Sequence, residues 1–160
     1  MGLAVAETDP AQARACLRES RELSTALGYH SVGDLVAATQ IAVLVGDQPA
    51  ALELGRSAIR ALQPGADRAR MVFVLYMIAG VLAATQPEPA SIILGAAETY
   101  VPESPIFAPL VSSAVTAALG EERARELRAR GADMDWDQAL AYALTQAAQA
   151  LSELQPGTQP

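Results

Sequence analysis

The fold of this chain is decided by residues 47–55, which read DQPAALELG. The same phrase occurs at residues 9–17 (DPAQARACL) and 86–94 (QPEPASIIL). It consists of a polar helix breaker, then an alanine, then a pair of apolar or small residues three and four positions after the alanine. The three phrases begin 38 and then 39 residues apart. A period of about 34 to 47 residues built only from helical pattern is typical of stacked helix pairs of the tetratricopeptide or a related type.

Each phrase is expected to start the outer helix of a pair, and the segments between the phrases are expected to supply the inner helices. The outer helices begin at Asp9, Asp47 and Pro89, and the inner helices begin at Ser31 and Asp67. Residues 3–7 stand where an inner helix ends in the later repeats. We therefore expect the first pair to be truncated and Met1 to be a boundary within a longer protein.

The longest apolar run, residues 71–84, is interrupted only by Tyr76 and Gly80. A helix that is apolar on all sides is buried in protein or in lipid. About 20 apolar residues are needed to cross a bilayer as a helix. This shorter run therefore predicts a central core helix, with a membrane-associated segment as the alternative.

The composition favours one domain without a nucleic-acid surface. The chain has 160 residues, of which 51% are hydrophobic, enough for one substantial core. The formal net charge of -7 opposes binding to phosphates, which needs clustered basic residues. Cys16 is the only cysteine, which excludes an internal disulfide. We expect Cys16 to be a small buried side chain in a protein of the cytoplasm.

The repeat ends after Tyr100. Residues 101–105 (VPESP) predict a loop. Further helices are expected from about Phe107 or Pro109 to Leu119, from 121 to 130 and from 135 to 151. The predicted fold is all-α: tetratricopeptide-like antiparallel helix-pair repeats, an α-solenoid, over residues 1–100, and C-terminal capping helices of the same domain over residues 101–152. Residues 153–160 are expected to be a disordered linker because they are rich in Pro, Gln and Gly.

Three phrases in the second half of the chain occur in a distinctive order. They are LGAAE at residues 94–98, ALGEE at residues 118–122, and Gly131 and Met134 ahead of QALAYAL at residues 138–144. Together they resemble the end of the helical-repeat region in large bacterial signal-transduction ATPases, such as the ATP-dependent LuxR-type transcriptional regulators and related proteins with adenylate-cyclase modules.

The resemblance covers roughly residues 90–145. It implies a helical regulatory region in which these phrases pack helices together, without reactive residues. In such regulators a nucleotide-binding domain lies upstream, and a DNA-binding helix-turn-helix often follows. This chain departs from that pattern because it has no phosphate-cradling glycine loop.

No group of residues has the spacing of a catalytic or metal site. Asp133, Asp135 and Asp137 alternate like the start of a calcium loop, but the turn glycine and the bidentate glutamate of that loop are missing. Helix capping explains these aspartates better. His30 is the only histidine and has no second ligand at metal spacing. We therefore expect no enzyme activity, no cofactor and no bound metal.

Two functions of different class fit this architecture. The first is a non-catalytic scaffold that binds a protein or peptide, or that couples an upstream ATPase to an output domain of the parent protein. The alternative is a sensor that takes a small-molecule inducer into an apolar groove between the inner helices. The candidate contacts for a partner are polar residues of the inner helices, Asp34, Thr39, Gln40 and Arg70.

A truncated first pair would leave an uncovered apolar patch at the N-terminal end. Leu3, Val5 and the apolar side of the helix from Asp9 would lack the neighbour that a repeat normally has. Apolar patches above a few hundred Å² usually find a partner, and a two-fold dimer covers a patch with its own copy. Leu3 and Val5 are therefore candidate contacts of a homodimer.

Overall fold

The computed structural model describes residues 9–27, 32–61, 68–101 and 107–154. These ranges contain eight α-helices and no β-strand, so the predicted all-α class is confirmed for this part of the chain. The helices are α2 (Pro10–Leu27), α3 (Val32–Leu44), α4 (Gln48–Ala61), α5 (Arg68–Leu82), α6 (Pro87–Tyr100), α7 (Phe107–Leu119), α8 (Glu121–Ala132) and α9 (Trp136–Leu154).

Aspartate side chains start three of these helices. Asp9 Oδ1 accepts hydrogen bonds from two N–H groups of the first turn of α2, at 3.0 and 3.1 Å, and Asp47 Oδ1 accepts one in α4 at 3.1 Å. Asp135 and Gln138 form a capping box, because each side chain accepts the backbone N–H of the other, at 2.8 and 3.0 Å. The interpretation of Asp135 as a helix cap is confirmed.

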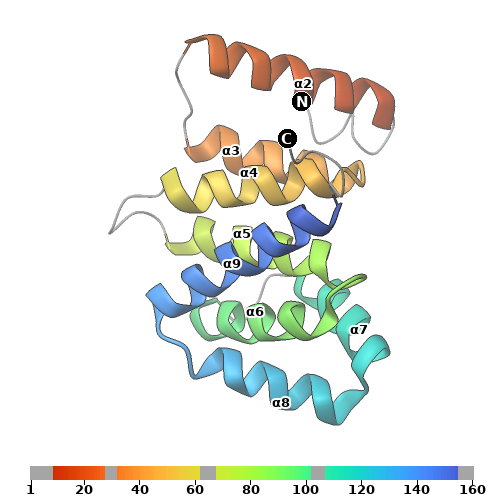
Figure 1. Ribbon diagram of the computed structural model, residues 1–160, viewed down its shortest axis with the longest axis vertical. Helices are drawn as coiled ribbons and strands as arrows, with labels where there is room; N and C mark the ends of the chain where they lie inside the picture. The colour runs from red at the N-terminus through yellow and green to blue at the C-terminus, as the bar shows by residue number, and fades with distance from the viewer. Residues whose placement is uncertain (1–8, 28–31, 62–67, 102–106, 155–160) are drawn as a thin grey trace.

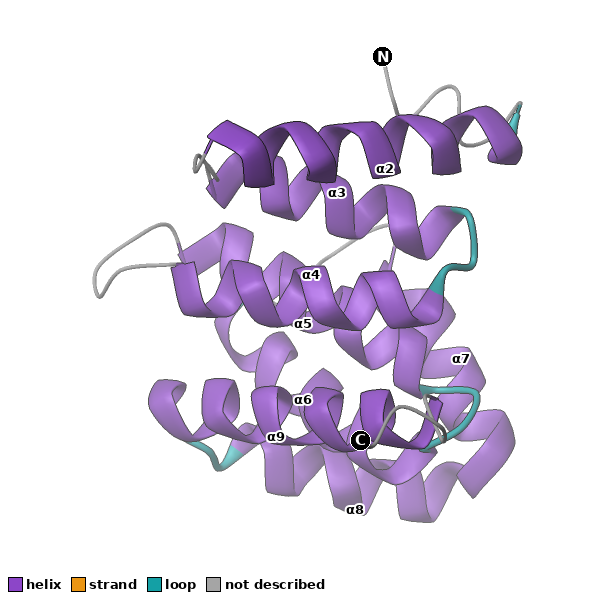
Figure 2. Cartoon of the chain, turned by 45° about the horizontal axis from the view of Figure 1, so that its top comes forward, coloured by secondary structure: helices purple, strands orange, loops and turns teal. Residues whose placement is uncertain are grey.

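The helices follow one another along the long axis of the molecule (Figure 1). They form two layers. The inner layer consists of α3, α5 and α7, in which α3 contacts α5 and α5 contacts α7. The outer layer consists of α4, α9, α6 and α8, in that spatial order. At the N-terminal end α2 lies against α3 (Figure 2), where the Arg14 guanidinium donates a hydrogen bond to the carbonyl oxygen of Val45.

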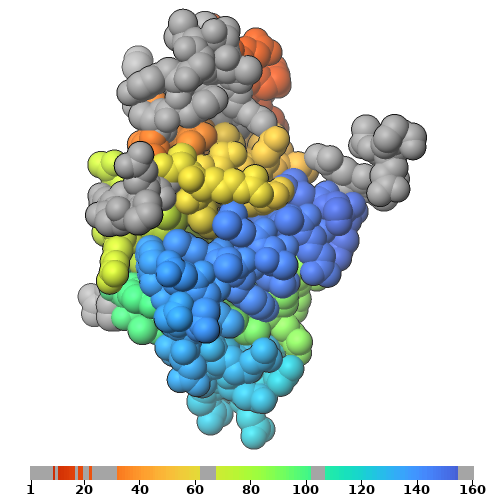
Figure 3. Space-filling view, turned by 60° about the vertical axis from the view of Figure 1, so that its left-hand side comes forward, coloured from red at the N-terminus to blue at the C-terminus, as the bar shows by residue number. Residues whose placement is uncertain are grey.

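The last helix does not continue the stack. From the end of α8 the chain turns back, and α9 lies between α4 and α6, over α5 (Figure 3). Successive outer helices of a regular helix-pair array contact one another, but here α9 separates α4 from α6. The residues that α9 buries are all alanines, Ala139, Ala143, Ala147 and Ala150. Of the three helices in the predicted capping region, α7 continues the inner layer beside α5, α8 lies at the end of the outer layer, and α9 returns between α4 and α6.

α5 is the centre of the core, as its apolar sequence predicts. Between Met71 and Leu82 only Phe73 and Gly80 are partly exposed. α5 contacts α3, α4, α6, α7 and α9, so it is enclosed by both layers. No helix in the described ranges is long and apolar enough to cross a membrane.

The backbones of α6 and α8 touch at two glycines. A Cβ atom on Gly95 would lie 2.7 Å from the carbonyl carbon of Arg128 and closer still to its oxygen. A Cβ atom on Gly131 would lie 2.8 Å from the backbone nitrogen of Ala96. Since real Cβ atoms do not approach backbone this closely, only glycine fits either position. Gly95 and Gly131 both belong to the phrases that carry the family resemblance.

The prediction that Cys16 is buried is wrong. Its side chain is exposed, whereas Ala13 of the same helix is 2% exposed and packs beside Val45. Within the described residues, α2 packs against α3. A residue one turn from the buried Ala13 can therefore face solvent although it belongs to the same predicted stripe.

Candidate functional site

The four residues predicted to contact a partner do not form one surface. Asp34 is exposed in the first turn of α3, and Arg70 is exposed in the first turn of α5. Gln40 of α3 is partly buried. The structure therefore leaves Asp34, Gln40 and Arg70 accessible in the inner layer.

Thr39 is not accessible. It is 1% exposed, and its hydroxyl donates a hydrogen bond to the carbonyl oxygen of Leu35 one turn earlier, at 2.7 Å. Its methyl group lies beside Gly55, so this face of α3 packs on the outer helix α4. A threonine can be buried this way because its own helix satisfies the hydroxyl. The dimer candidates Leu3 and Val5, and also His30, lie outside the described residues.

The inner layer has a nearly uncharged surface. α3, α5 and α7 contain only three charged residues among them, Asp34, Arg68 and Arg70, all near helix N-termini. Leu44 at the end of α3 is 42% exposed, and Leu110 of α7 is 68% exposed. Scattered exposed leucines are ordinary on a soluble protein. The two exposed leucines lie on different helices, α3 and α7, and both helices carry little charge.

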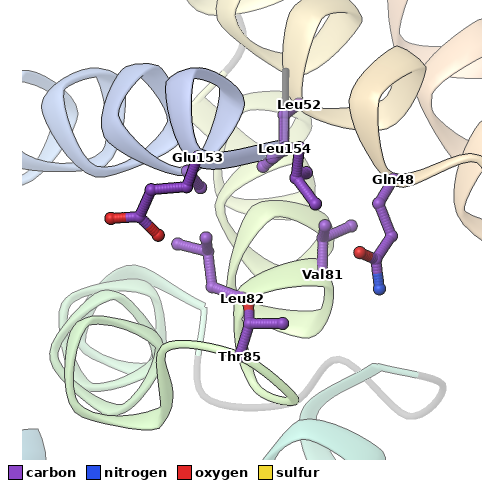
Figure 4. A pocket seen from close by; sticks show the side chains of 8 residues that line it. Gln48, Leu52, Val81, Leu82, Thr85, Glu153 and Leu154 are labelled. Atoms are coloured by element: carbon purple, nitrogen blue, oxygen red, sulfur yellow. The ribbon is translucent and has the colours of Figure 1, made fainter. Parts of the chain in front are cut away.

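A second candidate is a small pocket in which α9 meets α4 and the end of α5. Its volume is about 150 Å³. Figure 4 shows the apolar side chains of Leu52, Val81, Leu82 and Leu154 around it, whereas the Glu153 carboxylate extends away from Leu154 and Val81. The lining residues are Gln48, Leu52, Val81, Leu82, Thr85, Ala150, Glu153 and Leu154. The centre of the pocket is apolar, and its polar groups lie at the rim.

Glu153 is the only charged residue that lines this pocket. Its carboxylate accepts a hydrogen bond from Gln86 Nε2 at 2.7 Å and a weaker one from Gln149 Nε2 at 3.4 Å. Gln86 Oε1 is buried and meets no donor in the described part of the chain.

A third group of polar side chains joins α6, α7 and α8. Arg128 donates from Nη2 to Ser112 Oγ at 2.9 Å and to Thr116 Oγ1 at 3.2 Å, so it holds α8 against α7. Burial raises the pKa of the Glu98 carboxyl, and the charge of Arg128 opposes part of that shift. Burial, and then the charge of Glu98, raises the pKa of Tyr76 to about 12.

This polar group is structural in character. The Tyr76 hydroxyl is already used, because it donates to the carbonyl oxygen of Val101 at 2.9 Å. Within the described ranges, no three His, Cys, Asp or Glu side chains are grouped so that they could hold a metal ion. The arrangement around Arg128 therefore explains how three helices are fixed and suggests no reaction.

Comparison of the chain with protein-family models, with curated proteins and with solved structures finds no match.

Proposed function

We propose that this chain is a non-catalytic regulatory domain that binds a protein or peptide partner, or another domain of its parent protein, through its inner layer. The observation that carries the proposal is the low charge of α3, α5 and α7 combined with the exposure of Leu44 and Leu110. Stacked helices offer extended surfaces, and a partner helix with an apolar face is recognised by such surfaces.

The parent protein that we propose is a bacterial transcriptional regulator of the signal-transduction ATPase type, with tetratricopeptide-like repeats, acting in the cytoplasm. The resemblance of residues 90–145 is the basis for this context. It is supported by the backbone contact of Gly95 and Gly131, since the matching phrases of that family are expected to pack helices. In this reading the chain itself binds no nucleic acid, no cofactor and no metal.

The test begins with partner segments selected by display against the folded chain. We expect Leu110→Arg to weaken their binding by about ten-fold or more, because truncating or charging a central apolar contact typically has effects of this size. Glu122→Arg on exposed α8 is the control and should bind normally. Equal binding by both variants would exclude the inner layer. ATP binding by the isolated chain, measured by calorimetry, would contradict a purely non-catalytic role.

A small-molecule sensor remains the second candidate, because the structure contains the pocket between α4, α5 and α9. The pocket lies between α5 and the outer-layer helices α4 and α9, whereas the sequence predicted an inducer in a groove between the inner helices. A ligand that binds only the folded state raises the melting temperature in a saturable way. A thermal-shift screen of metabolites therefore tests this candidate separately from partner binding.

A further inference from the structure

We propose that the pocket between α4, α5 and α9 binds a small organic cation: an ammonium group attached to one compact hydrocarbon group no larger than a benzene ring. The proposal rests on the sensor function above and names its class of ligand. It does not require that the inner layer binds a partner.

The size of the hydrocarbon group follows from the volume of the pocket. Apolar cavities of about 150 Å³ accept a benzene-sized molecule, and the pocket has about this volume. Sites for larger ligands usually measure about 300 to 1,000 Å³. Leu52, Leu82 and Leu154 converge on the centre in Figure 4, so this part of the ligand is apolar.

The charge of the ligand follows from the rim. Glu153 supplies the only formal charge in the lining, and a carboxylate can accept about four hydrogen bonds. Within the described residues, Gln86 and Gln149 donate to it. The carboxylate therefore has acceptor capacity to spare. An ammonium brings both donors and positive charge, whereas an anion would be repelled here and by the net charge of -7.

The position of the pocket gives binding a structural consequence. Ala150, Glu153 and Leu154 belong to the last turns of α9, while Leu52 and Leu82 belong to α4 and α5. A ligand between them contacts both sides of the junction. We therefore expect the ligand to hold the C-terminal end of α9 against α4 and α5.

The experiment uses the full chain and three probes of similar shape: benzylammonium, neutral benzyl alcohol and anionic benzoate. Methyl resonances of Val81, Leu82 and Leu154 are followed by NMR during titration. We expect saturable shifts at millimolar benzylammonium, the range for a ligand of so few atoms, weaker binding of the alcohol and none of benzoate. Hydrogen exchange at the end of α9 should slow with benzylammonium. Equal binding of the three probes, or no saturable shift at these methyl groups, would overturn the proposal.

Two pairs of variants localise the interaction. Glu153→Gln should weaken benzylammonium about five-fold, the factor expected for one partly exposed ion pair, and leave benzyl alcohol unchanged. Glu122→Gln removes the same charge from α8 and should change neither. Ala150→Leu should fill the pocket and abolish binding of both probes, with folding checked by thermal melting. If Glu153→Gln and Glu122→Gln weaken the binding of benzylammonium equally, the rim carboxylate is not the ligand contact. Weaker binding of the partner segments by Leu110→Arg would still support the inner layer as the partner surface.

Discussion

The backbone contact between α6 and α8 gives the sharpest test of the fold. Gly95→Ala adds one methyl group, which would lie 2.7 Å from both the carbonyl carbon and the Cα atom of Arg128. Ordinary contact begins near 3.4 Å, so the two helices must separate by roughly 0.7 Å or more. The obstacle is backbone rather than a flexible side chain. The strain therefore has to be taken up by moving one helix.

The expected loss of stability can be worked from three contributions. Overpacking a well-filled interior destabilises by about 1 to 3 kcal/mol, and this site belongs at the upper end because backbone resists displacement. Separating the helices also weakens the buried hydrogen bond from Ser91 Oγ to the carbonyl oxygen of Ala124, now 3.0 Å long, which contributes about 1 kcal/mol. Replacing glycine by alanine inside a helix returns about 1 kcal/mol. The net destabilisation for Gly95→Ala is therefore about 3 kcal/mol.

Urea denaturation followed by circular dichroism at the helix band measures this change. Gly131→Ala should lose a similar amount, because its Cβ would lie 2.8 Å from the backbone nitrogen of Ala96. Gly80→Ala in α5 is the matched control: its Cβ would meet only a Val111 methyl group, at 3.4 Å, so it should be neutral or stabilised by up to about 1 kcal/mol. If Gly95→Ala unfolds at the same urea concentration as the parent chain, the two backbones are not in contact and the reasoning fails.

Two further predictions concern single side chains. Asp47→Ala and Asp135→Ala should each lower the free energy of unfolding by about 0.5 to 2 kcal/mol in urea titrations, because each removes an N-cap; Asp133→Ala, outside any N-cap, should have little effect. Glu98→Gln should raise the melting temperature at pH 7, because a folded-state pKa raised by burial means that the ionised carboxyl destabilises the fold. The gain in melting temperature should vanish at pH values below the ordinary glutamate pKa, where position 98 is neutral in both the parent chain and the variant. A gain that persists unchanged at pH 3 would show that ionisation of Glu98 is not its cause.

Helix boundaries were predictable because they depend on local chemistry. Asp47 and Asp135 cap helices through hydrogen bonds that span three residues. Gly46 and Gly120 stand between helices at φ values of 72° and 80°, a left-handed conformation that favours glycine. The apolar run of α5 predicted a core helix because every face of that helix is apolar and needs a neighbour.

The position of α9 was not predictable in the same way. A periodic stripe shows which face of a helix is buried, but not which helix it meets. The fully buried residues of α9 are small alanines, which fit many surfaces, so the sequence does not specify its place between α4 and α6. Thr39 failed as a contact candidate for a related reason: the sequence does not reveal that its hydroxyl bonds to its own helix. The pocket was missed because its lining depends on where α9 returns.

The attachment of α9 connects the two proposed properties of the chain. Alanines bury little area each, so the larger side chains of α9 that pack against the core, among them Trp136, Leu140, Leu144 and Leu151, contribute strongly to holding this helix. At the N-terminal end Trp136 packs edge-on against Tyr100 with ring centroids 4.8 Å apart, and the Arg68 guanidinium lies 5.6 Å from the Trp136 ring centre. The C-terminal end instead adjoins the incompletely filled pocket.

A ligand that binds more tightly when α9 is attached to α4 and α5 than when α9 is detached increases the fraction of molecules with α9 attached. α5 is the element through which this change would reach the inner layer. It contributes Val81 and Leu82 to the pocket, and it also meets α7 through Phe73, whose ring lies 5.2 Å from that of Phe107. Because α7 presents Leu110, a shift of α5 would alter the surface proposed for the partner. Pocket occupancy and partner binding would then be linked by one rigid helix, and the linkage must act equally in both directions.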